Sequence, residues 1–219
     1  FIHKNITGNA YGVLKWAMSL DGRTGLKNGE SKWITNEYSR SAVHSLRADF
    51  DAIVVGGNTL RKDDPLLTSR GKKSPEPLRV VFTKSLNLPL ESNLWNCETA
   101  KTLVVYDESS ADEKYLDQIP KCVEIEKISS DNPKLLSKLL ADRGLNKILW
   151  ECGPELATSA FKNGCIQEII AFIAPKILGG ISSMTPFSDL DFKDMSEVKI
   201  LNKGRMKSLN GDIFMNHLL

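Results

Sequence analysis

The stretch Ala52-Ile-Val-Val-Gly-Gly-Asn-Thr-Leu-Arg-Lys-Asp-Asp-Pro-Leu-Leu-Thr-Ser-Arg70 is the most informative part of this chain of 219 residues. Its apolar start followed by a glycine pair is typical of an interior strand that reaches the edge of a sheet. Glycines let backbone amides approach a ligand closely, and Asn58 and Thr59 can donate to phosphate oxygens. Charged side chains follow at the same rim, namely Arg61, Asp63, Asp64 and Arg70. We therefore expect a ligand-binding loop here, the alternative being a solvated turn after a core strand.

Strand and helix signals alternate along the rest of the chain. We expect strands at residues 12–19, 52–55, 78–82, 102–105, 123–125, 146–150 and 166–174. We expect helices from a cap at Thr35 or Asn36 to about Ala48, from the capping box at 110–113, from Pro133 to Gly144, and at 153–163. A glycine-rich loop fills 21–32, and residues 197–219 read as an antiparallel hairpin that turns at Asn210-Gly211. The chain is thus predicted to be one α/β domain over residues 1–219, with a mostly parallel central sheet flanked by helices and a C-terminal antiparallel hairpin.

Composition excludes several classes of function. Hydrophobic residues make up 41% of the chain and charged residues 26%, as in an ordinary soluble globular protein. The net charge of +2, without a basic run that contains aromatic residues, argues against nucleic-acid binding. Apolar runs such as Ile169 to Ala174 are too short to cross a membrane, and no signal peptide is recognisable at Phe1.

The cysteines and histidines do not form a metal-binding pattern. Cys97, Cys122, Cys152 and Cys165 have no C-x-x-C spacing, and the three histidines lie far apart in the sequence. Scattered thiols of this kind are typical of core residues in a reducing compartment. We therefore expect a cytoplasmic protein with free cysteines and no metal.

A second candidate ligand-binding segment runs from Trp150 to Thr158. A buried strand is expected to end at Glu151, and Gly153-Pro154 then starts a helix directly. The free amides and the dipole of a helix start favour an anion such as a pyrophosphate. Glu151 would lie at the carboxyl end of a central strand, where catalytic or substrate-orienting groups are found. The alternative is an ordinary capped helix with a solvated glutamate.

Other catalytic patterns are missing. The chain has no G-x-G-x-x-G, no P-loop and no G-x-S-x-G, and His44 lies mid-helix, where a packing or surface role is expected. Two polar ligand sites without a nucleophile favour catalysis by binding and orientation. Hydride transfer fits, because the cofactor carries the chemistry and the protein aligns the reactants.

Six motifs, taken together, resemble a known family. They are Lys15-x-x-x-Ser19-Leu-Asp-Gly-Arg23-Thr, Gly29-Glu-Ser31-x-Trp33-Ile-Thr35, Leu46-Arg47-Ala, Asp63-Asp-Pro-Leu-x-Thr68-x-Arg70, Glu151-x-Gly-Pro-x-Leu-Ala157 and Ala174-Pro-Lys-x-Leu-Gly179. In order and spacing they are similar to the pyrimidine reductases of bacterial riboflavin biosynthesis, the 5-amino-6-(5-phosphoribosylamino)uracil reductases. The resemblance implies a dihydrofolate-reductase-like fold, NADPH as cofactor, and reduction of a phosphoribosylamino-pyrimidine to its ribityl form.

The resemblance also implies site residues. The substrate-binding positions are Ser31, Arg47, Leu67, Arg70 and Glu151. The NADPH-binding positions are Ala17, Trp33, Thr59, Asp63, Ser85, Gly153, Pro154, Glu155, Leu156, Ala157, Thr158 and Ser159. Glu151 and Lys15 are the candidate catalytic residues, with Glu151 orienting the substrate and Lys15 or water delivering a proton.

The chemistry of these side chains agrees with those roles but leaves alternatives open. Arg47 and Arg70 suit the 5′-phosphate of the substrate through bidentate contacts. Thr83-Lys84-Ser85 suits the 2′-phosphate of NADPH, or is an ordinary turn. Trp33 offers a flat apolar surface to the dinucleotide, or is structural. Lys15 and Asp64 either form a charged pair or line the site.

Members of this family often carry a zinc deaminase with H-x-E and P-C-x-x-C motifs, and neither occurs here. Residues 1–10 resemble the linker that follows such a deaminase, so we expect that domain upstream or on a separate protein. The family suggests a homodimer. The alternatives are a related reductase that acts on the still-aminated pyrimidine or on a pterin-like compound, and a non-catalytic NADPH-binding module.

Overall fold

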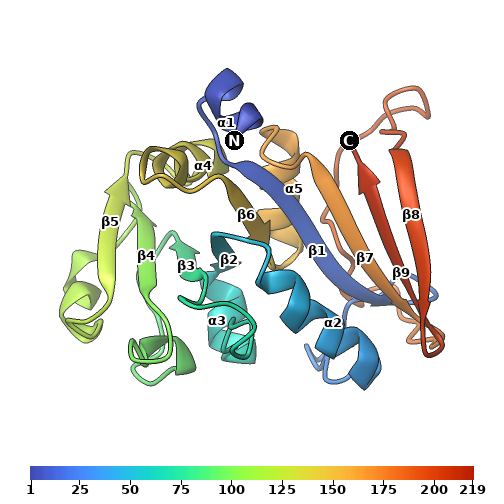
Figure 1. Cartoon of the computed structure of the whole chain (residues 1–219), viewed down its shortest axis with the longest axis horizontal. Helices are drawn as coiled ribbons and strands as arrows, with labels where there is room; N and C mark the ends of the chain where they lie inside the picture. Colours follow the sequence, from blue (N-terminus) through green and yellow to red (C-terminus); the bar gives the residue numbers. More distant parts are fainter.

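A nine-stranded sheet with the strand order β5-β4-β3-β2-β6-β1-β7-β9-β8 forms the centre of the computed structural model, which describes residues 1–219 (Figure 1). The strands are β1 (Tyr11–Ser19), β2 (Ala52–Gly56), β3 (Leu78–Thr83), β4 (Thr102–Asp107), β5 (Glu124–Ile128), β6 (Lys147–Trp150), β7 (Glu168–Ala174), β8 (Asn202–Leu209) and β9 (Asp212–Leu218). The helices are α1 (Ile2–Thr7), α2 (Glu37–Arg47), α3 (Gly57–Asp63), α4 (Pro133–Asp142) and α5 (Pro154–Lys162), with short 3-10 helices η1 (Asn93–Trp95) and η2 (Glu113–Gln118).

The sheet is parallel from β5 to β7 and antiparallel from β7 through β9 to β8. The parallel strands β2 and β4 are almost wholly buried, as expected for strands covered on both faces. β8 and β9 form a hairpin that turns at Asn210 and Gly211, both with positive φ. The predicted mostly parallel sheet with a C-terminal hairpin is confirmed.

Helices cover both faces of the sheet because its strands bury alternate residues on opposite sides. Ile53 and Val55 of β2 join the core on the side of α2 and α3, which contribute Val43 and Leu60. Ala52 and Val54 of β2 pack on the opposite side with apolar residues of α4 and α5. No helix in the structure combines the length and apolarity required to cross a bilayer.

Most predicted element boundaries are correct to within a few residues. Asn36 caps α2 by accepting from the Ser39 N–H, and Pro133 opens α4. Two predictions need correction. The residues after the glycine pair form α3 rather than a loop. Asp112, not Ser110, caps the short helix that follows β4.

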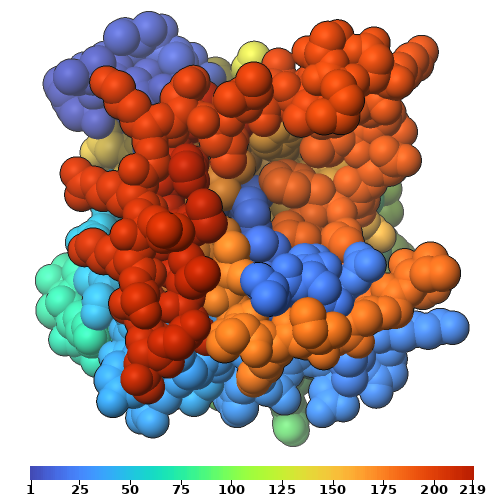
Figure 2. Space-filling model, turned by 90° about the vertical axis from the view of Figure 1, so that its right-hand side faces the viewer, coloured from blue at the N-terminus to red at the C-terminus, as the bar shows by residue number.

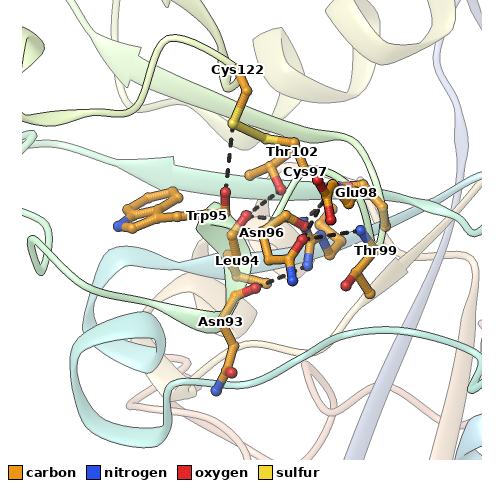
Figure 3. The surroundings of a disulfide bond; sticks show 11 residues. Asn93, Leu94, Trp95, Asn96, Cys97, Glu98, Thr99, Thr102 and Cys122 are labelled. Atoms are coloured by element: carbon orange, nitrogen blue, oxygen red, sulfur yellow. Dashed lines mark hydrogen bonds between the residues drawn. A yellow bond between two sulfur atoms is a disulfide. The ribbon is translucent and has the colours of Figure 1, made fainter.

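Two of the four cysteines form a disulfide, so the prediction of free thiols is wrong for this pair. Cys97, after η1, is bonded to Cys122, just before β5, with their Cα atoms 6.2 Å apart (Figure 3). The two residues are 25 positions apart without a recognisable spacing motif, and the fold brings them together at the ends of neighbouring segments. Cys152 and Cys165 are free, as predicted.

Arg79 of β3 binds, from inside the protein, the loop of residues 93–100 that contains Cys97. Its side chain is fully buried, and its two terminal nitrogens donate to the carbonyl oxygens of Asn93, Leu94, Asn96 and Ala100 at 2.6 to 3.2 Å. Burial lowers the pKa of Arg79 to about 10, so the guanidinium stays charged at neutral pH. One cation thereby binds four backbone acceptors of the irregular loop, of which only the Leu94 carbonyl has a second side-chain donor, the Thr102 hydroxyl at 2.7 Å.

Replacing Arg79 with methionine should destabilise the fold strongly. Arg79→Met leaves the carbonyl oxygens of Asn93, Asn96 and Ala100 without a side-chain donor, and we expect the free energy of unfolding to fall by about 3 kcal/mol in urea denaturation. Arg205→Met, which removes an exposed arginine of β8, is the matched control and should change it by less than about 0.5 kcal/mol. A loss below about 1 kcal/mol for Arg79→Met would show that water replaces the guanidinium.

Candidate functional site

A cleft of about 810 Å³ opens at the carboxyl ends of β1, β2, β3 and β6. It is lined by residues after each of these strands and by the loop before α2. The two segments that the sequence singles out meet there, because a Cβ atom on Gly153 would lie 3.8 Å from Thr59 Oγ1. Both segments therefore line one cavity.

An ionic cluster of three side chains lies in this cleft. Glu151 Oε2 is 2.9 Å from Lys15 Nζ and 3.1 Å from Arg47 Nη2, and its Oε1 is 2.6 Å from Arg47 Nε. The remaining Arg47 nitrogen donates to the Thr68 carbonyl at 3.1 Å. The three side chains are only 8 to 14% exposed. They come from β1, from the end of α2 and from the residue after β6.

The cluster keeps Glu151 ionised. Burial alone would raise the pKa of Glu151, but the charges of Arg47 and Lys15 and their hydrogen bonds outweigh it and hold that pKa well below its ordinary value. Burial, followed by the Glu151 charge, raises the pKa of the neighbouring Cys152 thiol. At neutral pH this part of the cleft therefore holds an ionised Glu151 paired with Lys15 and Arg47, beside a neutral thiol.

Lys15 and Asp64 do not form the pair that was one of two predicted alternatives. Lys15 binds Glu151 and lines the cleft, as the other alternative predicted, whereas Asp64 does not belong to the lining. Asp64 accepts from Ser92 Oγ and from the Asn93 backbone and side chain, at 2.7 to 2.9 Å. Asp64 therefore attaches the end of α3 to the loop held by Arg79.

Most predicted site residues line the cleft. They are Lys15, Ala17, Ser31, Trp33, Arg47, Thr59, Asp63, Leu67, Ser85, Glu151, Gly153, Pro154, Glu155, Leu156 and Ser159. Arg70, Ala157 and Thr158 do not belong to the lining. Arg70 is exposed outside it, while the helical turn of α5 directs Ala157 into the core and lets Thr158 bond the backbone of Ser188. The uninterrupted run from Gly153 to Ser159 is thus split by helix periodicity.

The indole of Trp33 is held at the mouth of the cleft. It is 63% exposed, and the Arg40 guanidinium lies 4.7 Å from its ring centroid. Lys176 Nζ donates to the backbone carbonyl oxygen of Trp33 at 2.8 Å. The contacts fix an exposed ring beside the cavity rather than bury it in a core.

Sequence reasoning missed one wall of the cleft. Met184, Thr185 and Pro186 line it from the irregular segment after β7. In the space-filling view this segment, in orange, lies against the loop after β1, in blue (Figure 2). The Thr24 N–H donates to the Met184 carbonyl there at 2.8 Å. Asp21 joins the same two segments, and its pKa falls to about 2 because it accepts hydrogen bonds from Ser19 and from backbone amides.

The glycines at the strand ends have different roles. A Cβ atom on Gly57 would lie 2.9 Å from Thr83 Oγ1, so close packing against Thr83 requires a glycine here. Gly153 is the N-cap of α5 and provides no capping side chain, and Pro154 follows at the first helical position.

The first-turn amides of α5 border the cleft and fit an anionic group such as the pyrophosphate of a dinucleotide. No group of three or more His, Cys, Asp or Glu side chains is arranged to hold a metal ion.

The comparisons with known proteins agree with this architecture. The family model described as RibD C-terminal domain matches residues 10–208. The chain is 38% identical over 211 residues to the riboflavin biosynthesis protein RibD of Synechocystis, covering 95% of this chain and 57% of that protein. It therefore spans little more than half the length of that relative.

Two solved structures show the fold. RibD of Acinetobacter baumannii superposes with a TM-score of 0.85 at 30% identity, over 100% of this chain and 60% of that one. Dihydrofolate reductase of Enterococcus faecalis superposes with a TM-score of 0.53 at 10% identity, over 95% of each chain, which confirms the predicted dihydrofolate-reductase-like fold. With nearly its whole length matched by the family model, the chain belongs to the RibD C-terminal domain family.

Proposed function

We propose that this chain catalyses the NADPH-dependent reduction of the ribosyl group of 5-amino-6-(5-phosphoribosylamino)uracil to the ribityl form in riboflavin biosynthesis. The observation that carries the proposal is the shared cleft, with the Glu151 ion cluster beside the uncapped start of α5. The names of the RibD relatives in Synechocystis and Acinetobacter, with the family membership, support the assignment to riboflavin biosynthesis.

The strand order supports one placement of the two ligands. β2 and β6 are neighbours in the sheet, with β3 on one side and β1 on the other. A pyrophosphate at the start of α5 would then have Ser85 toward its adenosine half, and Ala17 and Trp33 toward its nicotinamide half. The substrate would occupy the side with Ser31, Leu67 and Glu151. Thr59, Asp63 and the residues from Gly153 to Leu156, with Ser159, would contact the dinucleotide.

Glu151 would orient the substrate, because its position is fixed by two cations and its charge is constant at neutral pH. NADPH, when bound, supplies the hydride for the sugar carbon. Lys15 holds its ammonium in the cleft through Glu151 and is the proposed proton donor from the protein. Arg47 has most of its donors committed to Glu151 and Thr68, so the exposed Arg70 is the freer of the two arginines proposed for the 5′-phosphate.

The proposal extends to the surroundings of the enzyme. We infer a homodimer in the cytoplasm, with the deaminase step carried by an upstream domain or by a separate protein. Support comes from the family resemblance and from the RibD relatives, of which this chain spans about 57 to 60%.

Glu151→Gln tests the central role of the carboxylate. The variant keeps the shape of the side chain but loses the charge that fixes the substrate, so kcat/KM for the deaminated pyrimidine should fall about 10- to 100-fold. The dissociation constant for NADPH, measured by titration calorimetry, should change by less than about twofold. Loss of NADPH absorbance reports turnover, and the still-aminated pyrimidine is assayed in parallel.

Glu98→Gln, an exposed carboxylate outside the cleft, is the control and should retain full activity. Unchanged kinetics in Glu151→Gln would reject the role of Glu151. NADPH binding by the wild type without oxidation of NADPH by either pyrimidine would instead favour a non-catalytic binding module.

The low pKa of Glu151 predicts a pH-dependent contribution to stability. Its folded pKa lies below the ordinary value of 4.5, so the ionised carboxylate stabilises the fold above that pH and the stabilisation is lost as pH falls. Glu151→Gln should be less stable than the wild type by about 3 kcal/mol at pH 7. The gap should narrow as pH is lowered from about 6 to about 3 in urea denaturation series. A constant gap over that window would contradict the ionised state.

Arg70→Ala tests the proposed phosphate contact. Removing one charge-assisted contact should raise KM for the phosphorylated substrate about 10- to 100-fold while kcat changes little. Arg205→Ala, an exposed arginine on β8, serves as the control for net charge. An unaltered KM in Arg70→Ala would move the phosphate site elsewhere.

A further inference from the structure

Four charged side chains lie at the end of the cleft between α3 and the turn after β3. They are Arg61, Lys62, Lys84 and Asp131. The hydroxyl residues Thr83 and Ser85 line the same end. In the sheet, β3 is separated from β6 by β2, and β1 lies on the far side of β6. The turn after β3 is therefore remote from β1 and Lys15, and α5, which follows β6, lies between them in this order. A dinucleotide with its pyrophosphate at α5 and its nicotinamide toward β1 would bring its adenosine ribose here.

The charge of Lys84 is already compensated. Its ammonium forms an ion pair with Asp131, and this hydrogen bond is the main reason why the pKa of Lys84 is raised. Asp107 and Glu155 add negative charge around the same ammonium. Lys84 thus offers little net positive charge to an anionic ligand.

Arg61 differs because its partners are neutral. Its guanidinium donates to the carbonyl oxygen of Asn87 and to Oδ1 of Asn58, and it forms no ion pair with a carboxylate. The Asn87 N–H in turn contacts Ser85 Oγ at 3.4 Å, so the guanidinium lies beside the Ser85 turn. A guanidinium has five N–H donors, and two bonds leave donors for a further acceptor.

We infer that Arg61 is the specificity-determining residue that recognises the 2′-phosphate of NADPH, an assignment that rests on the proposed function. The uncompensated guanidinium, held beside the Ser85 hydroxyl, matches a phosphomonoester with its several acceptor oxygens. NADH carries a neutral hydroxyl at the same ribose position and cannot use this charge. Arg61 therefore makes the enzyme prefer NADPH to NADH.

The experiment measures the affinity of the full chain for four nucleotides by titration calorimetry. The probes are NADPH, NADH, adenosine 2′,5′-bisphosphate and AMP, so the contribution of the 2′-phosphate is measured twice. The wild type should bind the phosphorylated member of each pair more tightly. Arg61→Leu should weaken binding of NADPH and of adenosine 2′,5′-bisphosphate about 10- to 100-fold, with less than about twofold change for NADH and AMP.

Arg205→Leu removes one positive charge on β8, outside the cleft, and should keep the full preference. Three results would overturn the inference. Arg61→Leu could retain the wild-type preference, all four ligands could weaken equally because Arg61 only supports the Ser85 turn, or Lys62→Leu instead of Arg61→Leu could abolish the preference. A wild type that binds and oxidises NADPH would leave the proposed function standing in each case. A wild type that binds neither NADPH nor NADH would remove both.

Discussion

The buried charge of Glu151 is the constraint around which the functional end of the molecule is built. An ionised carboxylate that is almost out of contact with water is unfavourable unless cations compensate it closely. Lys15 and Arg47 provide this compensation from β1 and from the last turn of α2. The ion cluster therefore joins three separate elements at one end of the sheet. It leaves this part of the cleft with an ionised carboxylate held in a defined position.

The sequence was sufficient to predict the sheet, most of its flanking helices and the two segments that line the cleft, since these have strong local patterns. Buried strands appear as apolar runs, Pro133 opens a helix, and Asn210-Gly211 turns a hairpin. α3 was missed because only Gly57 and Leu60 of its residues are buried, which leaves no apolar stripe to recognise. The partner of Lys15 is 136 residues away, and no local pattern encodes a contact of that range. The place of Met184 in the cleft was not predicted for a related reason, since it lies in an irregular segment whose sequence has no periodic apolar pattern.

Arg79 and the Cys97–Cys122 bond restrain the same loop in different ways. The disulfide connects the loop to the start of β5, whereas Arg79 ties its carbonyl oxygens to β3. Disulfides are rare in reducing compartments. The hydrogen bonds of Arg79 do not depend on the oxidation state of the cysteines, so they would maintain the loop in either condition. Through Ser92 and Asn93 the loop also holds Asp64 at the end of α3, next to the cleft-lining Asp63.

The place of β1 in the sheet affects how the protein is made. β1 is the first strand of the chain, yet it is inserted between β6 and β7, and Tyr11 pairs with Lys147. The backbone of β1 cannot pair with β6 or β7, and its apolar side chains cannot be fully buried, until most of the chain has left the ribosome. Such non-local pairing slows folding and prolongs the time for which aggregation-prone intermediates expose apolar surface. Chaperone protection of the newly made β1 segment would thus matter more for this fold than for one in which each strand pairs with the next in the sequence.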